Sequence, residues 1–393
     1  MVVNLGLSAT DLAAVVRCFG QPHRIRRSLQ LLDLDHQPIE DVTSFFLEGQ
    51  VNVNSGQGDG VSRSATISLY DPTHAVGLDV ANVGEGTVSP RYLLQAYRGM
   101  FVDTLDRWVD IPAGVFWFNS PSRSGDILNI EGQGKEALAR YGVVRQIAFT
   151  ASANKMTVIR QILESIGETR FRLESTTATM GKAWTLTYDT SPWAACQSIA
   201  AGMGRQLFYD AEGYVVCRTP SSSAVYTFRQ GNGGTVRNAD PSFGYSSDSA
   251  YNYVLASGAT PQGQNVPIRR GAVVASTHPM YLTRNGTFVP LRYDISNDKL
   301  TTTTQVSDLA KSTLASVVLD TQTGGWDSSP VWHLDEGDVV HVTDAIDDAG
   351  TGASYGVNVR MTSWSFPLTL GTQSNGANRR VTRTSRRLVR SVA

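Results

Sequence analysis

The sequence predicts an α+β fold, mainly β, divided into several packed units. Stretches that alternate apolar with polar residues recur along the chain, and this is the period of a half-buried strand. Segments with apolar residues at helical spacing are fewer, and the 36 glycines favour turns over long helices. Because 393 residues exceed the usual size of one hydrophobic core, we expect two to four packed units.

From about Ser28 to Gly132 the signals are mostly those of strands. A short helix precedes this segment, because Ser8 followed by Asp11 resembles a capping box. In GVFWFNSPSRSGDILNIEG we expect a hairpin that places Trp117 opposite the region of Leu128. The other expected strands are Ser28–Asp33, Gln50–Asn54, Ser64–Asp71 and, as either strand or irregular structure, Ser89–Gly99.

The glycines of Gly56–Gly60 suggest a phosphate-binding loop at first sight. Such a loop is followed by a helix, whose free N–H groups hold the anion. Here the β-branched, alternating run Ser64–Tyr70 follows instead, and no Gly-Lys-Ser/Thr sequence is present. The glycines therefore indicate a long, flexible connection between two strands.

Residues 150–220 are typical of a compact α/β unit. The stretch KMTVIRQILESIG places apolar residues on one helical face and ends at Gly167. A second helix begins with Ser191 as N-cap and Pro192 at the first helical position. A hairpin follows, with its turn at Asp210–Gly213.

From residue 221 onward the pattern is again mostly β, with one helix. The helix is expected around Ala310 in TTQVSDLAKSTLASVVL. The expected strands are Tyr251–Gly258, the alternating run Tyr355–Leu368, and two strands joined by a tight turn in VWHLDEGDVVHVTD.

Overall composition excludes several classes of protein. A net charge of −1 gives no global argument for binding nucleic acid or a membrane. Cys18, Cys196 and Cys217 cannot form a full disulfide framework, so we interpret them as small buried hydrophobic residues in a reducing cytoplasm. The N-terminus lacks a basic leader, and no run of about 18 apolar residues occurs. We expect a soluble protein.

Candidate chemistry is sparse. The six histidines (His23, His36, His74, His278, His333 and His341) show no zinc-ligand spacing. His333 and His341 flank an acidic turn, which we interpret as a solvated hairpin end rather than a metal or acid–base centre. Asp344, Asp347 and Asp348 form either an acidic surface loop or a calcium site, although the twelfth position of a calcium loop is Tyr355 and not Glu.

No catalytic, cofactor-binding or metal-binding residue is assigned. No Gly-x-Ser-x-Gly nucleophile motif is present. Trp193 is expected to anchor the start of its helix in the core, with a stacking platform for sugar as the alternative. We therefore expect no cofactor and no enzymatic activity.

The C-terminal segment is strongly basic. After Asp348 no acidic residue occurs, whereas the sequence NRRVTRTSRRLVRSVA contains six arginines: Arg379, Arg380, Arg383, Arg386, Arg387 and Arg390. Three interpretations remain open: a disordered solvated tail, docking on an acidic protein surface, or contact with DNA.

The order of these segments resembles the baseplate hub, or minor tail, proteins of long-tailed bacteriophages. The resemblance extends from about Ser28 to Leu370. It rests on the strand–loop–strand EGQVNVNSGQGDGVSRSATISLYDP, the hairpin and helix in AGVFWFNSPSRSGDILNIEGQGKEALA, and the middle stretches TVIRQILESIG and DTSPWAACQSIAAGMGRQLFYDAEGYVVCRTP. YNYVLASG and LDEGDVVHVTD extend it toward the C-terminus.

The resemblance implies two β-barrel domains of the tail-tube type, with smaller α/β domains packed outside them. Three subunits would form a pseudo-sixfold ring. The implied domains are an N-terminal helical segment 1–27, a first tube-like barrel 28–149, an α/β domain 150–220, a second tube-like domain with an accessory β segment 221–378, and a basic tail 379–393.

By the same resemblance the protein is a structural virion component at the distal end of a tail. It would close or gate the tube and contact the tail-tube or distal tail protein, the tape-measure protein and the receptor-binding proteins. It would bind no specific nucleic acid and have no membrane segment. The alternatives are a tail-associated cell-wall hydrolase and a carbohydrate-binding tail-tip protein.

Overall fold

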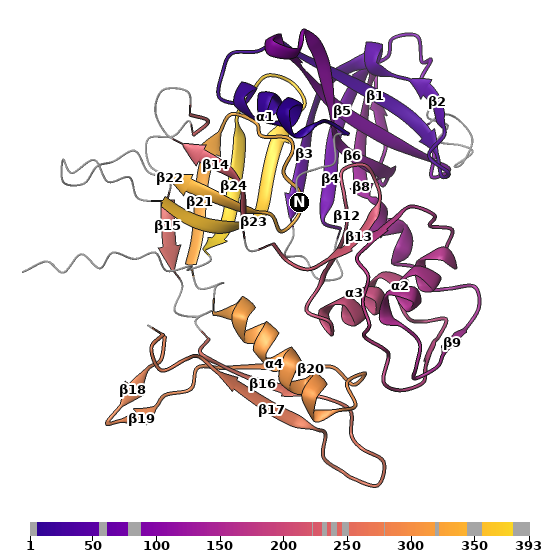
Figure 1. The fold of residues 1–393 in the computed structure, drawn as a ribbon. Coiled ribbons are helices and arrows are strands. Elements are labelled where there is room, and N and C mark those ends of the chain that lie inside the picture. The colour runs from indigo at the N-terminus through magenta and orange to yellow at the C-terminus, as the bar shows by residue number, and fades with distance from the viewer. Residues whose placement is uncertain are drawn as a thin grey trace, which may run out of the picture.

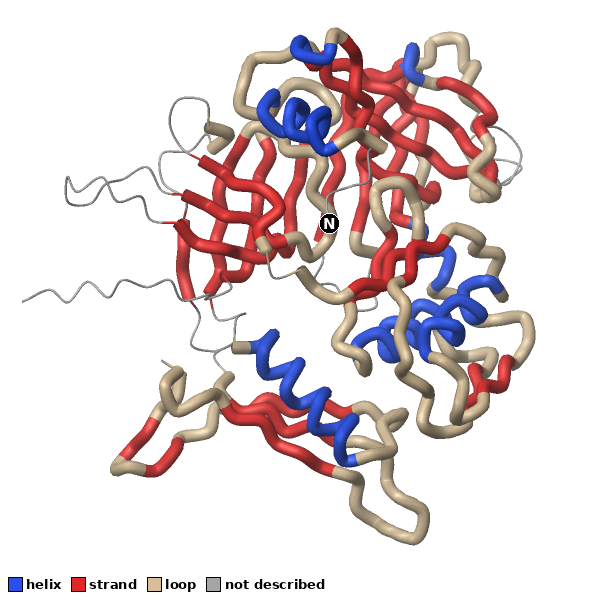
Figure 2. Tube along the Cα trace, in the orientation of Figure 1, coloured by secondary structure: helices blue, strands red, loops and turns tan. Residues whose placement is uncertain are grey.

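The structure is a computed structural model, and the elements it describes form three parts (Figure 1). It describes residues 6–54, 61–77, 88–221, 223–229, 234–236, 242–245, 251–278, 280–318, 322–343 and 356–379. The parts are a large sheet, an α/β unit, and a small sheet covered by one helix (Figure 2). The expectation of a mainly β, α+β protein is confirmed.

The large sheet has 14 strands from both ends of the chain. Its main order is β15-β21-β24-β23-β3-β4-β8-β6-β5-β1-β2, with β7 beside β8 and β22 between β14 and β23. The bounds are β1 Ile25–Asp33, β2 Pro38–Asp41, β3 Phe46–Asn54, β4 Arg63–Tyr70, β5 Tyr92–Val102, β6 Arg107–Phe118, β7 Ser122–Ser124, β8 Ile127–Gly134, β14 Ala224–Arg229, β15 Ser242–Tyr245, β21 Gln322–Ser328, β22 Val339–Thr343, β23 Gly356–Pro367 and β24 Gln373–Arg379.

The pairing of β3 with β23 joins the two halves of the sheet. The strands are antiparallel, with Trp364 opposite Val53 and Phe366 opposite Val51. All four side chains are buried in one hydrophobic core that spans both halves. The described strands thus form one mixed sheet and close into no separate barrel, which differs from the two barrels expected. The reason is the length of β23, which pairs with β22 and β24 and still extends to β3.

The α/β unit has its own hydrophobic core, formed between residues 139 and 217. Asn154 caps the first helix, and Ser191 caps the second by accepting a hydrogen bond from the backbone N–H of Ala194. Trp193 is buried and stacks on Tyr209 at 5.2 Å between ring centroids, as expected of a core anchor. The unit contains β9 Ile147–Phe149, α2 Lys155–Glu164, β10 Phe171–Leu173, β11 Trp184–Leu186, α3 Pro192–Ala201, β12 Gln206–Tyr209 and β13 Val215–Arg218, preceded by the 3-10 helix η3 Lys135–Ala139.

The third part is a three-stranded sheet with α4 (Thr303–Val317) packed on one face. Its strands are β16 Tyr253–Ser257, β17 Arg269–Val273 and β20 Arg292–Ser296, with the small hairpin β18 Thr283–Arg284 and β19 Thr287–Phe288 beside them. The ammonium of Lys182 in the α/β unit donates to the backbone carbonyl of Asp298 at 2.7 Å. This contact ties the third part to the α/β unit.

The N-terminal helix α1 (Ala9–Cys18) lies against the large sheet. Ser8 caps it through the backbone N–H of Asp11, as expected, and the Asp11 carboxylate pairs with Arg107 at 2.9 Å. Phe19, directly after the helix, inserts among the rings of Tyr226 and Trp332. The segment therefore packs on both halves of the sheet. Two further 3-10 turns, η1 Thr43–Phe45 and η2 Asp103–Leu105, connect strands.

Ser89–Gly99, expected as either strand or irregular structure, belongs largely to the long strand β5. Two local expectations need correction. Trp117 lies opposite Gln133 and not near Leu128, because the short strand β7 occupies the place beside Leu128. VWHLDEGD forms no strand, and only β22 follows it. The domain boundaries stay a prediction. Within the described ranges, no helix has the length and apolar character needed to span a membrane.

Replacing Phe19 with Ala should strongly destabilise the protein. The ring is 1% exposed and lies between the two halves of the sheet. Its loss leaves a cavity, so we expect the free energy of unfolding in urea to fall by about 3–5 kcal/mol. The control Val144→Ala removes methyl groups that are 90% exposed and should change it by less than about 0.5 kcal/mol. Equal effects of the two variants would contradict the role given to Phe19.

A buried charged junction as the candidate functional site

The segment Val331–Asp338 lies inside the protein, where the large sheet, the segment after α1 and the α/β unit meet. We call it the junction segment. Its side chains contact β4, β5 and β14 of the large sheet, the segment after α1, and β13 of the α/β unit. The interpretation of this stretch as a solvated hairpin end is wrong, since His333 is fully buried. The junction segment is covered because residues distant in sequence supply partners for nearly all of its side chains.

The first part of the junction segment is aromatic. The His333 ring stacks on Phe19 at 5.0 Å between centroids, and Tyr226 meets it edge-on at 5.3 Å. Neither ring nitrogen has a hydrogen-bond partner among the described residues, and burial lowers the pKa of His333 to about 3. The imidazole is therefore neutral at physiological pH and acts as a flat packing group.

Arg98 of β5 holds the neighbouring ring, Trp332. Its guanidinium lies 4.0 Å from the ring centroid and donates to the backbone carbonyl of Pro367 in β23. Burial lowers the pKa of Arg98 to about 9. One side chain thus links the first half of the sheet, the junction segment and the second half.

The charged part begins with a buried ion pair between Arg63 and Asp335. The guanidinium lies 3.2 Å from the carboxylate, and both side chains are almost completely buried. Arg63 faces the core because it is in phase with Ala65 and Ile67 along β4. It also donates to the carbonyl of Ala113 at 2.8 Å. Burial raises the pKa of Asp335 even though Arg63 opposes the shift.

A second buried ion pair attaches the α/β unit. Arg218, at the end of β13, lies 2.9 Å from the Asp338 carboxylate and donates to the backbone carbonyl of Glu336 at 2.9 Å. The turn between these two acids needs Gly337, which has a φ of +70°. A Cβ at this position would also lie 2.3 Å from Gln206.

A buried glutamate, Glu136, and a partly exposed one, Glu336, meet at the hydroxyl of Ser62. The hydroxyl donates to Glu136 at 2.5 Å and is also within hydrogen-bond reach of Glu336. One oxygen of each carboxyl has no partner among the described residues. Burial, and next the charge of Glu136, raise the pKa of Glu336 to about 8. Burial also raises the pKa of Glu136. At neutral pH Glu336 therefore holds a proton that an exposed glutamate would have released.

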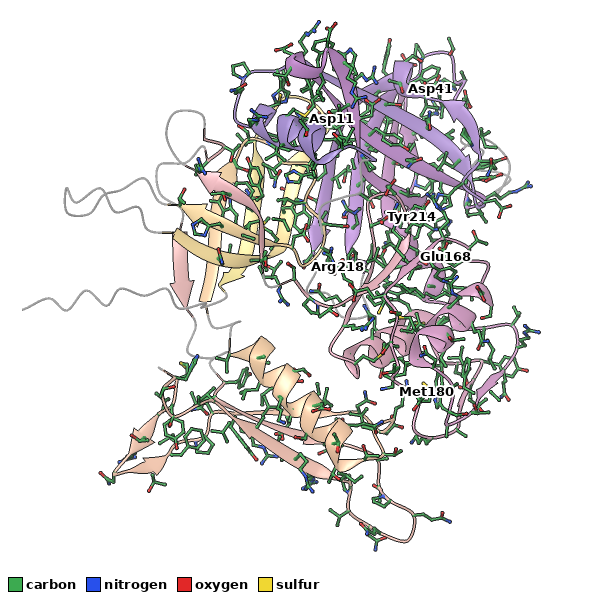
Figure 3. All side chains as sticks on the ribbon, in the orientation of Figure 1. Asp11, Asp41, Glu168, Met180, Tyr214 and Arg218 are labelled. Atoms are coloured by element: carbon green, nitrogen blue, oxygen red, sulfur yellow. The ribbon has the colours of Figure 1, made fainter. Side chains whose placement is uncertain are left out.

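Lys135, next to Glu136 in η3, connects the large sheet to the α/β unit. Its ammonium lies 2.7 Å from the Glu168 carboxylate and donates to the carbonyl of Gly213 at 3.1 Å. It also contacts the His36 ring at 2.8 Å. Burial is the main cause of the lowered pKa of Lys135, with Glu168 opposing it. Figure 3 shows Glu168 on the side of the α/β unit that faces the sheet, and Arg218 where its last strand leaves toward the second half.

The arrangement is suited to holding parts together. Arg63, Arg218 and Lys135 each face a carboxylate and a backbone carbonyl inside the protein. No group of three or more His, Cys, Asp or Glu side chains that could hold a metal ion was found among the residues that the structure describes. Its chemistry is therefore that of fixed internal charge pairs.

The other residues singled out from the sequence lie outside the junction segment. Gly56–Gly60, the candidate calcium loop and the arginines from Arg380 onward fall outside the described residues, and Arg379 ends β24. Cys196 and Cys217 are buried, and burial raises the pKa of both thiols, that of Cys217 to about 12. Cys18 is partly exposed.

Sequence reasoning missed Arg63, Lys135 and Arg218. A signal existed for Arg63, because a charged residue in phase with buried apolar residues of a strand needs an internal partner. No local signal identifies the partners, which lie 272 positions away for Arg63 and 120 positions away for Arg218.

Comparison with solved structures identifies the fold. The chain matches a tail protein from Neisseria meningitidis with a TM-score of 0.59 and 11% identity, over 90% of this chain and 97% of that one. It matches a 43 kDa tail protein of prophage MuSo2 from Shewanella oneidensis with a TM-score of 0.56 and 11% identity, over 90% and 98%. The chain has the fold of these phage tail proteins.

A third match supports this assignment. A prophage tail protein from Listeria monocytogenes aligns with a TM-score of 0.52 and 10% identity, over 89% of this chain and 94% of that one. No protein-family model and no curated protein matches the sequence. The resemblance noted in the sequence is thus confirmed at the level of the tail-protein fold, and the junction segment lies within that fold.

Breaking the buried ion pair between Arg63 and Asp335 should destabilise the protein more than replacing both residues with apolar ones. Arg63→Met leaves Asp335 buried without its cation, and we expect the free energy of unfolding to fall by about 3–5 kcal/mol. Adding Asp335→Leu should recover most of this loss, because two apolar side chains leave no unpaired charge inside the protein. The control is Arg107→Met at the partly exposed pair with Asp11, which should cost at most about 1 kcal/mol. Urea unfolding of the four proteins measures these values, and a double variant as unstable as Arg63→Met would contradict the assignment.

Glu336 should make the tail-protein fold less stable as the pH rises. Its pKa rises from 4.5 to about 8 in the folded protein. Between these values the folded chain keeps a proton that the unfolded chain has released, so stability falls with increasing pH by up to about 1.4 kcal/mol per pH unit. Glu336→Gln should therefore reduce the loss between pH 5 and pH 8 by about 3 kcal/mol.

Urea unfolding at pH 5, 6, 7 and 8 tests this expectation. The matched control is Glu164→Gln, whose carboxylate is 48% exposed and should leave the pH dependence unchanged. A pH dependence in Glu336→Gln equal to that of the parent protein would show that Glu336 is not protonated in the folded state.

Proposed function

We propose that this protein is a structural virion component, the baseplate hub at the distal end of a phage tail. Three copies form a ring that joins the tail tube to the tail-tip and receptor-binding proteins and closes or gates the tube. The observation that carries the proposal is the extent of the structural match, which takes in nearly the whole length of two tail proteins as well as 90% of this chain. A shared extra domain would match over only part of each chain.

The layout of the large sheet supports a ring of copies. The two ends of its main strand order are different strands, β2 and β15. Contacts between unlike surfaces of identical subunits are heterologous, and they close into a ring when the rotation permits. We assign the tube-like parts of each copy to residues 28–149 and 221–378, with the α/β domain 150–220 outside them.

The work of such a protein is done by its interfaces, and we propose no catalytic residue. The internal charge pairs of the junction segment support this role, because they fix the angle between the two halves of the sheet and the α/β unit. Trp193, the candidate sugar platform, is 1% exposed and covered by Tyr209, which speaks against a carbohydrate site there.

Mass measurement in solution and analysis of purified tails test the proposal together. We expect either a particle of three times the 42.5 kDa chain mass, or a monomer in solution of which each purified tail contains three copies. Antibody labelling should place it at the end of the tail opposite the head.

Two results would contradict the hub assignment. One is absence of the chain from purified tails. The other is degradation of purified peptidoglycan by the isolated protein, which would favour the cell-wall hydrolase instead. A variant with Arg63→Met should enter tails less efficiently than Arg107→Met if the rigid junction is needed for assembly.

A further inference from the structure

One face of the large sheet is polar yet almost free of charge. It is formed by the outward side chains of four neighbouring strand segments: Gln50–Asn54 of β3, Ser64–Ser68 of β4, Asn129–Gln133 of β8 and Ser363–Ser365 of β23. We call it the uncharged face. Glu131 is the one charged residue among these outward side chains, Glu48 of β3 lies at the border opposite Ser68, and none of these side chains is Lys or Arg.

The strand register makes this face continuous. Ser365 lies opposite Asn52, Asn52 opposite Ser64, and Ser64 opposite Gln133. Gln50, Thr66 and Glu131 form the next row. All of these side chains are partly or fully exposed, whereas their sequence neighbours on the other side of the strands, such as Val51 and Ala65, are buried in the core.

Several polar groups of the uncharged face already bond to one another. The Gln50 amide donates to the Asn52 carbonyl oxygen at 3.0 Å. The Ser68 hydroxyl donates to the Asn129 carbonyl oxygen at 2.9 Å. Because these groups satisfy each other, they have less to gain from a hydrogen bond to another molecule.

This composition is poorly suited to strong binding of either a protein or a nucleic acid. A stable protein interface needs buried aromatic, aliphatic or arginine anchors, and these segments offer none. Binding to nucleic acid depends on Lys and Arg that neutralise phosphates. The charges of Glu131 and, at the border, Glu48 have the same sign as a phosphate. The face is instead suited to contact with water and with a polyanion that must not adhere.

We propose that the uncharged face lines the passage through which nucleic acid leaves the tail. Its hydroxyl and amide groups keep the passage wetted, and the lack of basic side chains lets the polyanion move past without being retained. The inference rests on the proposed hub function and adds which surface of the chain faces the passing polymer.

Thiol labelling in intact tails tests which way this face points. Asn52→Cys and Thr66→Cys place single thiols on the uncharged face, in a background with Cys18→Ser to remove the one partly exposed native thiol. Val144→Cys, at a site that is 90% exposed in the α/β unit, is the control on the outside. Each variant is treated with a small maleimide and with a long polyethylene-glycol maleimide.

A passage lining has a distinct labelling pattern. In intact tails we expect the small reagent to label all three sites and the long reagent to label only the Val144→Cys variant. Dissociated tails should lose this selectivity. Labelling of Asn52→Cys and Thr66→Cys by the long reagent in intact tails would place the face outside, and protection from both reagents would make it a contact between proteins. Either result overturns the inference but leaves the hub assignment standing, whereas absence of the chain from tails overturns both.

Adding positive charge tests the second part of the proposal. With Asn52→Lys and Thr66→Lys together, phosphates can pair with the wall, so we expect release of nucleic acid at low salt to slow on the order of tenfold and to recover at high salt. Val144→Lys is the matched control and should release nucleic acid at the parental rate. Unchanged release from tails that carry the double lysine variant would overturn the proposed passage lining.

Discussion

Arg63 places a guanidinium inside the protein, and much of the architecture follows from supplying it with a carboxylate there. A buried cation is costly unless it is paired and hydrogen-bonded. Asp335 provides the pair and the Ala113 carbonyl the hydrogen bond. Since Asp335 belongs to a segment that also carries His333 and Asp338, this one requirement brings an entire stretch of polar chain into the interior.

The junction segment has a different partner for each of its chemical types. Its aromatic residues pack on Phe19 and Arg98, and its acids meet Arg63 and Arg218. Apolar contacts alone would permit small sliding motions between the sheet and the α/β unit. Ion pairs with defined geometry restrict such sliding, because a buried charge that leaves its partner is not rescued by water. In the ring proposed above, such rigidity matters because small changes of angle within one copy add up around the ring.

Local signals in the sequence predicted the elements but not the site. Ser191 and Pro192 define the start of α3 on their own, and the alternation of β3 and β4 is visible within a few residues. The stretch VWHLDEGD has the composition of an exposed turn, and it is buried only because partners arrive from β4, β13 and the segment after α1. Contacts between residues so far apart in the sequence produce no periodic pattern of apolar and polar residues. The two separate barrels implied by the family resemblance did not appear for a related reason. Alternating residues locate the strands, but they do not show that β3 pairs with β23, which lies far away in the chain.

That pairing also imposes an order on biosynthesis. β3 leaves the ribosome early, but its partner residues 363–367 follow roughly 300 residues later. Until then one edge of β3 offers unpaired backbone groups, and the shared core is open on that side. A chain that ends before β23 leaves this edge of β3 unpaired and removes the strand that joins the two halves of the sheet. The joining of the two halves of the sheet therefore depends on synthesis of almost the whole chain.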